Sequence, residues 1–252
     1  MKNKQVLNPQ VALITGSARR IGAKIARILH ENGINVVLHC NSSLKEAKKL
    51  CSILNQSRGD SAVVLQADLS KIKTLNNLVK QAVNSWGRLD ILVNNASCFY
   101  KTPVGSITES IWNDLMDTNL KAPFFLSQAA IPYLKKQRGC IINIVDIHAD
   151  RPMADHPIYC VSKAGLAMLT KTLARELGPD IRVNSVSPGA IIWPEKGNAL
   201  SPKLKKQIID HTALKTHGDP EEIAKAVLFL VRDATYVTGQ DIAVDGGRKL
   251  FD

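Results

Sequence analysis

The chain has 252 residues, of which 45% are hydrophobic and 22% charged, as is ordinary for a folded globular protein. No apolar run reaches the roughly 20 residues of a membrane-spanning helix, and the start does not resemble a signal peptide, so we expect a cytoplasmic protein with no membrane partner. The net charge of +11 is spread over short clusters typical of solvated helix faces, which argues against nucleic-acid binding. Five scattered cysteines lack Cys-x-x-Cys spacing and predict reduced thiols rather than a metal site.

Apolar segments alternate with helical patterns along the chain. The first expected strand, 11–14, leads through a glycine-bearing turn to the helical pattern Ile21, Ile25, Ile28 and Leu29. Further strands are expected at 34–38, 62–66, 90–93, 140–145, 182–186 and 241–244. Strands that alternate with helices form parallel sheets, because each crossover connection has to span the sheet. The pattern predicts one α/β domain over residues 10–252, with a doubly wound, seven-stranded parallel sheet covered by helices on both faces.

Two segments stand apart from this core. Residues 1–9 are expected to be flexible, as chain ends without apolar anchors usually are. The stretch after the strand at 182–186 contains Pro194, Gly197 and Pro202, so a substrate lid is expected near residues 190–212.

The turn after the first strand reads Thr15-Gly16-Ser17-Ala18-Arg19-Arg20-Ile21-Gly22 and opens a helix. The unpaired N–H groups and the dipole of a helix N-terminus favour a pyrophosphate. Gly16 permits a tight turn and Gly22 a close approach of helix and strand, whereas Arg20 replaces the middle glycine of the usual fingerprint. The turn predicts a dinucleotide site, although such a turn also occurs for purely structural reasons.

The end of the second strand predicts which dinucleotide binds. It reads His39-Cys40-Asn41-Ser42-Ser43 and lacks the carboxylate that would hydrogen-bond the ribose of NAD and repel a 2′-phosphate. NADPH is therefore favoured over NADH. We hypothesise that Arg20 supplies the positive charge for the phosphate and that Ser42 and Ser43 supply hydrogen bonds.

Tyr159 and Lys163 are four residues apart in a helical pattern, and Asp146 lies thirteen positions before the tyrosine. Positions i and i+4 share a helix face, so the lysine ammonium is expected near the phenol, where it favours the ionised or proton-donating form. This arrangement suits proton transfer, although the same spacing also occurs by chance on helix surfaces.

Together the motifs resemble the short-chain dehydrogenase/reductase family over nearly the whole chain. They are Thr15-Gly16 through Gly22, Asp68-Leu69, Asn94-Asn95-Ala96, Asn119, Tyr159 with Lys163, and Pro188-Gly189. The resemblance implies a Rossmann fold, a homotetramer and hydride transfer from a nicotinamide. With the turn and strand-end patterns, it predicts cofactor contacts at Gly16, Arg20, Ile21, Gly22, Asn41, Ser42, Ser43, Asp68, Leu69, Asn95, Ala96, Ser97, Tyr159, Lys163, Pro188 and Gly189.

Some of these residues have a purely structural alternative. The resemblance implies that Asp68 and Leu69 contact adenine, that Asn95 and Ala96 line the cofactor cleft, and that Asn119 holds a helix distortion and a relay water. Asp68 could instead cap the following helix, and Asn119 could satisfy buried backbone groups. Pro188-Gly189 would bend the chain beside the nicotinamide or form an ordinary turn.

Asp146 departs from the family pattern, in which a serine usually hydrogen-bonds a substrate carbonyl. An ionised carboxylate would repel a ketone oxygen, but it can accept hydrogen bonds from an amino-pyrimidine ring and, when protonated, donate to a ring nitrogen. With Arg20 and the segment Asn94-Asn95-Ala96-Ser97-Cys98-Phe99-Tyr100, it resembles the pteridine reductases of the family, and the segment after Pro188 resembles their bacterial branch. The resemblance implies NADPH-dependent reduction of dihydropterin or dihydrofolate to the tetrahydro form, with oxidised pterin and folate as further candidates.

That resemblance also assigns the substrate contacts. Phe99 would stack on the pterin, Ser97 would hydrogen-bond its edge, and Trp193 would close over it, with core packing and a hydrophobic anchor as the alternatives for the two rings. Asp146, Tyr159 and Lys163 would be the catalytic residues, with Tyr159 as proton donor or relay. His148 is expected to be an exposed loop residue, although it could tune Asp146.

Two other functions stay open. One is a reductase of the same family that acts on a carbonyl substrate such as a 3-oxoacyl thioester, a sugar or a quinone. The other is a non-catalytic NADP sensor, against which the Tyr159 and Lys163 pair argues, because a sensor needs no proton donor.

Overall fold

The computed structural model describes residues 9–191, 193 and 201–251. The predicted flexible segment up to residue 8, and residues 192 and 194–200 of the predicted lid, lie outside this described part.

One seven-stranded sheet, parallel throughout, forms the centre of the molecule, with the strand order β3-β2-β1-β4-β5-β6-β7. The strands are β1 (Val11–Ile14), β2 (Asn35–Cys40), β3 (Ala62–Gln66), β4 (Ile91–Asn94), β5 (Cys140–Ile144), β6 (Arg182–Pro188) and β7 (Asp241–Val244). The strands β1, β2, β4 and β5 are buried along their whole length and β6 at every residue but Arg182, as expected for strands covered on both faces. The predicted fold class is confirmed.

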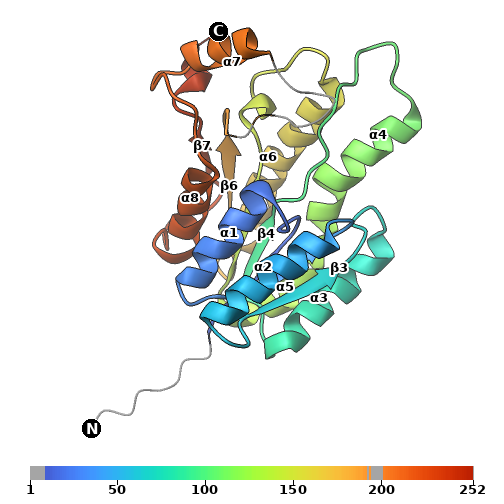
Figure 1. Ribbon diagram of the computed structural model, residues 1–252. Helices are drawn as coiled ribbons and strands as arrows, with labels where there is room; N and C mark the ends of the chain where they lie inside the picture. The colour runs from blue at the N-terminus through green and yellow to red at the C-terminus, as the bar shows by residue number, and fades with distance from the viewer. Residues whose placement is uncertain (1–8, 192, 194–200, 252) are drawn as a thin grey trace.

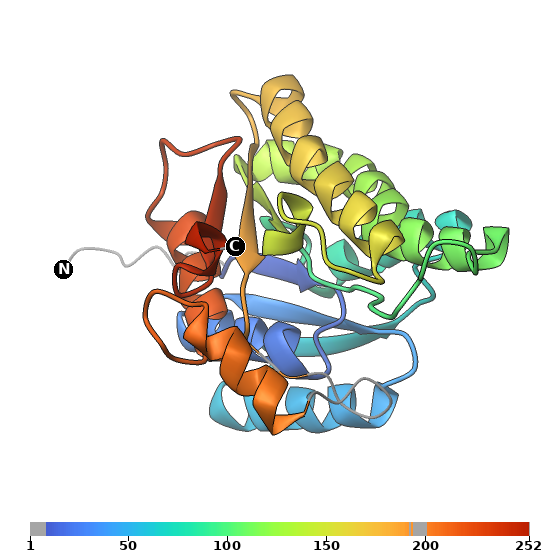
Figure 2. The same ribbon diagram turned by 90° about the horizontal axis from the view of Figure 1, so that it is seen from above.

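Helices cover both faces of the sheet, as Figures 1 and 2 show. One face packs against α1 (Arg20–Glu31), α2 (Leu44–Ser57) and α8 (Pro220–Arg232), and the other against α3 (Ile72–Trp86), α5 (Ala122–Gln137) and α6 (Pro157–Leu177). The apolar positions of α1 recur at helical spacing, so Ile25, Ile28 and Leu29 all face the sheet. Each face therefore carries its own apolar core.

Shorter elements complete the fold. They are α4 (Glu109–Met116), the π-helical turn η1 (Asp117–Lys121), the 3-10 turns η2 (Ile147–Ala149) and η3 (Arg248–Leu250), and α7 (Pro202–Asp210), which Figure 1 shows beside the C-terminus. Among the helices that the structure describes, none combines the length and the apolar character needed to cross a bilayer.

The strand order reverses beside β1, because β2 and β3 lie on one side of it and β4 to β7 on the other. In open α/β sheets, ligands bind outside the carboxyl ends of the strands at such a switch point. The segments that leave strands β1 to β6 at this edge contain the residues singled out by the sequence.

Candidate active site

The turn between β1 and α1 is built around two glycines. Gly16 has a φ of +63°, and a Cβ there would lie 2.9 Å from Cα of Ala96. A Cβ on Gly22 would lie 2.4 Å from the carbonyl oxygen of Gly16. Both positions therefore require glycine, for the conformation of the turn and for its approach to the segment after β4.

Asn95 and Thr15 tie this turn to β4. Asn95 Nδ2 donates to the carbonyl oxygens of Thr15 and Gly16 at 2.8 and 3.1 Å, while Thr15 Oγ1 accepts from the backbone N–H groups of Asn95 and Ala96 at 2.9 and 3.0 Å. The Asn95 amide thus stabilises the conformation of the turn. Thr15 was given no role of its own from the sequence. A hydroxyl between a buried strand and a tight turn could have indicated a side chain that hydrogen-bonds nearby backbone groups.

These features fit a dinucleotide. The first turn of α1 contains Arg20 and, among its described residues, no acidic side chain. The glycines let a ligand approach the backbone closely, and the helix N-terminus favours a negative charge. The expected pyrophosphate site at Gly16, Arg20, Ile21 and Gly22 is therefore compatible with the geometry.

The two arginines of this turn point in different directions. Nη2 of Arg20 donates to the carbonyl oxygen of Trp193 at 3.4 Å. Nη1 of Arg19 lies 3.9 Å from Oε1 of Glu46, in the first turn of α2. The helix α2 begins directly after Asn41, Ser42 and Ser43, where the 2′-phosphate is expected. Of the two arginines, Arg19 is the one that contacts α2. The sequence singled out Arg20 for this role, and Arg19 was not among the predicted cofactor contacts.

The remaining predicted cofactor residues lie at the same edge. Asp68 accepts hydrogen bonds from the N–H and the hydroxyl of Ser70 at 3.1 and 2.8 Å, whereas the residue at the N-cap of α3 is Lys71, so the helix-capping alternative for Asp68 is wrong. Leu69 is buried. Pro188 ends β6, and a Cβ on Gly189 would lie 2.6 Å from Cα of Asp245, so this bend also requires glycine.

Tyr159 and Lys163, in the first two turns of α6, lie close to Asp146, which follows the carboxyl end of β5. The Tyr159 hydroxyl donates to Oδ2 of Asp146 at 2.7 Å, and Nζ of Lys163 donates to the carbonyl oxygen of Ile144 at 2.9 Å. Nζ of Lys163 also lies 5.7 Å from the centre of the Tyr159 ring. The predicted grouping of the three catalytic candidates is therefore present in the structure.

The electrostatics of this group favour a protonated phenol. Burial, followed by the negative charge of Asp146, raises the pKa of Tyr159 well above its ordinary value. Burial lowers the pKa of Lys163 to about 8, against the opposing effect of the Asp146 charge. Of the two forms that the lysine was expected to favour, these shifts favour the proton-donating one, because burial and the Asp146 charge both oppose ionisation of the phenol.

Asn119, in the π-helical turn η1, connects the segment after β4 to α6. Its Oδ1 accepts from the N–H of Cys98 and the hydroxyl of Ser97 at 2.8 and 3.0 Å, and its Nδ2 donates to the Cys98 carbonyl and the Ser162 hydroxyl at 3.0 and 3.1 Å. The side chain therefore sits at a helix distortion and also satisfies backbone groups, so both expectations for Asn119 describe the same residue.

Phe99 forms one wall of the site. Its ring stacks on His156 with centroids 4.7 Å apart and planes 10° apart, and it meets Tyr159 edge to face at 4.8 Å. Phe99 remains 36% exposed, so it does not simply fill the core. His156 was not singled out from the sequence, because only the tertiary fold brings it to Phe99.

Trp193 and His148 have separate sets of contacts. The Trp193 ring packs at 4.8 Å against His217, with Nζ of Lys205 at 5.6 Å from its centre. His148 is half-buried rather than exposed, and its backbone N–H donates to Oδ1 of Asp146 at 2.9 Å. His148 thus orients Asp146 through its backbone, which corrects the expectation of an exposed loop residue.

Comparisons with known proteins show which proteins this chain is similar to. A family model described as enoyl-(acyl carrier protein) reductase matches residues 16–249. A 3-oxoacyl-[acyl-carrier-protein] reductase FabG of Staphylococcus epidermidis is 38% identical over 239 residues, covering 94% of this chain and 97% of that protein. Pteridine reductase 1 of Leishmania tarentolae is 34% identical over 281 residues, covering 95% of this chain and 96% of that protein.

A solved structure is similar over nearly the whole fold. It is that of a blue fluorescent protein from a metagenomic library in complex with NADPH, with a TM-score of 0.88, 36% identity, and coverage of 97% of this chain and 99% of the other. The family model, the full-length relatives and the similar solved structure lead to one conclusion: the chain belongs to the short-chain dehydrogenase/reductase family.

Proposed function

We propose that this protein is an NADPH-dependent oxidoreductase. Membership of the family supports the reaction class, and the similar solved structure was obtained in complex with NADPH. The end of β2 carries no acidic residue between His39 and Ser43, and Arg19 reaches toward α2 beside it, which favours a 2′-phosphate. We propose the same single domain over residues 10–252 and the same cytoplasmic location that the sequence predicts.

The geometry of the site best supports a nitrogen heterocycle of the pterin type as the substrate. The observation that carries this proposal is the carboxylate of Asp146, which is held 2.7 Å from the Tyr159 hydroxyl at the position where the family usually has serine. A carboxylate can accept hydrogen bonds from the amino and ring N–H groups of a pterin, whereas it would repel a carbonyl oxygen. The exposed Phe99 ring offers a flat surface beside it.

In the proposed reduction, each side chain of the site has its own role. Bound NADPH supplies the hydride. Tyr159 gives its proton to a ring nitrogen, since the phenol is protonated at neutral pH. Lys163, fixed by the Ile144 carbonyl, supplies positive charge that stabilises the phenolate left behind. Asp146, oriented by the N–H of His148, accepts from the substrate and from Tyr159.

A second candidate is a 3-oxoacyl thioester reductase, and similarity to known proteins favours it over the pterin assignment. The reductases FabG of Staphylococcus epidermidis and Staphylococcus aureus are 38% and 37% identical to this chain, against 34% for the pteridine reductase. A ketoacyl reductase named in the granaticin polyketide synthase of Streptomyces violaceoruber is 35% identical. The pterin proposal therefore depends on Asp146 rather than on overall identity.

One set of assays separates the two candidates. NADPH oxidation is followed with dihydrobiopterin, dihydromonapterin, dihydrofolate and folate, and in parallel with an acetoacetyl thioester. Higher kcat/KM for a dihydropterin supports the pterin proposal, and higher kcat/KM for the thioester replaces it with the second candidate. Tight NADPH binding without turnover of any substrate would point instead to a sensor.

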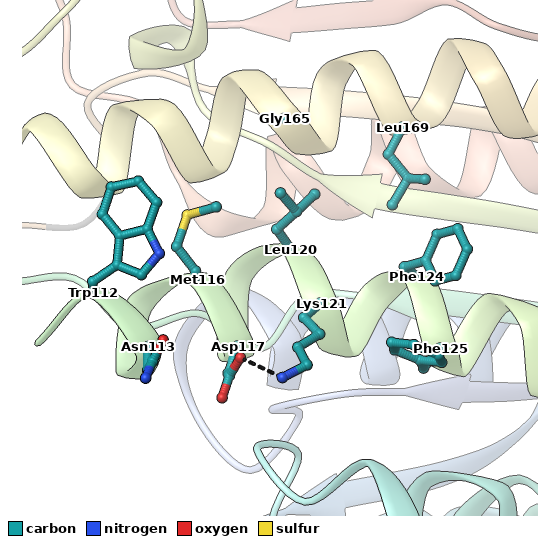
Figure 3. A pocket seen from close by; sticks show the side chains of 10 residues that line it. All are labelled: Trp112, Asn113, Met116, Asp117, Leu120, Lys121, Phe124, Phe125, Gly165 and Leu169. Carbon is teal, nitrogen blue, oxygen red and sulfur yellow. Dashed lines mark hydrogen bonds and ion pairs between the residues drawn. The ribbon is translucent and has the colours of Figure 1, made fainter. Parts of the chain in front are cut away.

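We propose that the protein assembles as a homotetramer and that the face made by α4, η1, α5 and α6 contributes to it. Figure 3 shows a groove on this face in which side chains of α4 and α5 point toward α6 around Gly165. Trp112 and Phe124 in this groove are 42% and 40% exposed, and Met168 on α6 is 58% exposed. Large apolar side chains exposed together are typical of surfaces that pack against another chain.

A further inference from the structure

The imidazole of His39 connects two turns that lie on either side of it. His39 is in β2 and is only 1% exposed. The backbone N–H of Gly16, in the turn after β1, donates to its Nδ1 at 3.2 Å. Its Nε2 lies 3.1 Å from the carbonyl oxygen of Ala67, in the turn after β3. One side chain thus joins the pyrophosphate turn to the segment that contains Asp68.

These two partners fix the state of the ring. The Gly16 amide can only donate, so Nδ1 carries a lone pair, and the Ala67 carbonyl can only accept, so Nε2 carries the proton. Burial lowers the pKa of His39, against the smaller effect of the Ala67 hydrogen bond, so the neutral form is favoured. The backbone carbonyl of His39 also accepts from the N–H of Ser17 at 3.0 Å.

We propose that His39 is a positioning residue for NADPH, which holds the Gly16 turn in its binding conformation through a single acceptor nitrogen, Nδ1. Gly16 adopts a left-handed conformation and packs against Cα of Ala96, so its amide has one fixed direction. Without an acceptor, this part-buried N–H would lose its hydrogen bond, and the turn would relax toward other partners. This inference rests on the proposed use of NADPH but on nothing about the second substrate.

Two substitutions distinguish a role of His39 in packing alone from a role of Nδ1 as a hydrogen-bond acceptor. In His39→Asn, the amide oxygen stands near the place of Nδ1 and keeps an acceptor for Gly16, but the donor to Ala67 is lost. In His39→Gln, the longer side chain brings its amide to the place of Nε2 and keeps the donor to Ala67, but the acceptor for Gly16 is lost. If His39 only filled space, neither substitution would be favoured for its hydrogen-bonding pattern.

The test measures the Kd of NADPH by fluorescence titration, together with the KM for NADPH and kcat, for the full-length wild type and both variants. We expect His39→Asn to bind within about threefold of the wild type and His39→Gln to bind about tenfold more weakly, as the loss of one backbone hydrogen bond predicts, with kcat nearly unchanged in both. Equal affinities in the two variants, or weaker binding by His39→Asn, would overturn the inference.

His30 provides the matched control. It is also a buried histidine, 3% exposed, but it lies in the last turn of α1 and hydrogen-bonds Ser61 at 2.7 Å, away from the nucleotide turn. His30→Gln should lower stability without changing the Kd of NADPH. A failure of the wild type itself to bind NADPH would contradict the proposed function rather than the role of His39.

A measurement on the unmodified protein covers the case in which the variants do not fold. Nitrogen-15 NMR of the histidine rings distinguishes the two neutral tautomers and the imidazolium, and His39 should be the Nε2–H tautomer at pH 7. The Nδ1–H tautomer or the imidazolium would leave no acceptor for Gly16 and would overturn the inference.

Discussion

The Tyr159 hydroxyl donates a hydrogen bond of 2.7 Å to Oδ2 of Asp146, so the phenol is paired with a carboxylate and not with Lys163. Burial and the carboxylate together raise the pKa of the phenol, so the protonated form of Tyr159 is favoured. This pairing joins Tyr159 to Asp146, the residue that stands where the family usually has a serine.

Tyr159→Phe should remove the proton donor and leave the cofactor site intact. We expect kcat to fall by about 10²- to 10⁴-fold, which is the usual contribution of general acid catalysis. Steady-state assays give kcat, and fluorescence titration should show a Kd for NADPH within about twofold of the wild type, since the ring packing is kept. A variant with near-normal turnover would contradict the role of Tyr159.

Asp146→Ser should restore the residue that is usual in the family and change the choice of substrate. We expect kcat/KM for dihydropterin to fall by about 10- to 100-fold, because the hydrogen bonds to a ring N–H are lost, and kcat/KM for an acetoacetyl thioester to rise. Asp146→Asn serves as the control, since it removes the charge but keeps the shape. A loss of both activities in equal proportion would argue against Asp146 as the residue that selects the substrate.

The pKa of Lys163, about 8, predicts how activity depends on pH. Lys163 is positively charged below this pKa and neutral above it, and only the charged form stabilises the developing phenolate. We therefore expect kcat/KM to be constant below pH 8 and to fall about tenfold per pH unit above it, because kcat/KM reports groups of the free enzyme. A profile measured from pH 6 to 10 that stays flat would show that the lysine charge is not required.

Arg19 and Arg20 should make different contributions to cofactor choice. Arg19 lies against Glu46 of α2, whereas Arg20 contacts the carbonyl of Trp193. We expect Arg19→Ala to lower the ratio of kcat/KM for NADPH to that for NADH by about tenfold, as the loss of one charged contact predicts, and Arg20→Ala to change this ratio much less. The opposite order would restore the assignment of the 2′-phosphate to Arg20.

Trp112→Glu should weaken the proposed tetramer. A charge in the apolar groove of Figure 3 would have to be buried without a partner when two copies pack together. Light scattering after size-exclusion chromatography should show a tetramer for the wild type and a smaller species for the variant, with circular dichroism as the control for folding. A variant that stays tetrameric would exclude this face from the assembly.

Periodicity and turn chemistry allowed the fold to be predicted closely from the sequence. The expected strands at 11–14, 62–66 and 241–244 match β1, β3 and β7, since short apolar runs bounded by turns have few alternatives. The strand at 34–38 was placed too early, because β2 continues through His39 and Cys40, which pair with Leu65 and Gln66 of β3. A neighbouring strand, which the local sequence does not contain, decides where such a ladder ends.

The sequence by itself determined the family, the order of the motifs along the chain and the identity of Tyr159, Lys163 and Asp146, because motifs depend on residue type and spacing. Only the tertiary structure decided which of these groups touch. It placed the phenol on Asp146 rather than on the lysine, the ring of His156 on Phe99, and His39 between Gly16 and Ala67. These contacts join residues on different strands and helices, so their distances follow from sheet register and helix packing, which no local pattern specifies.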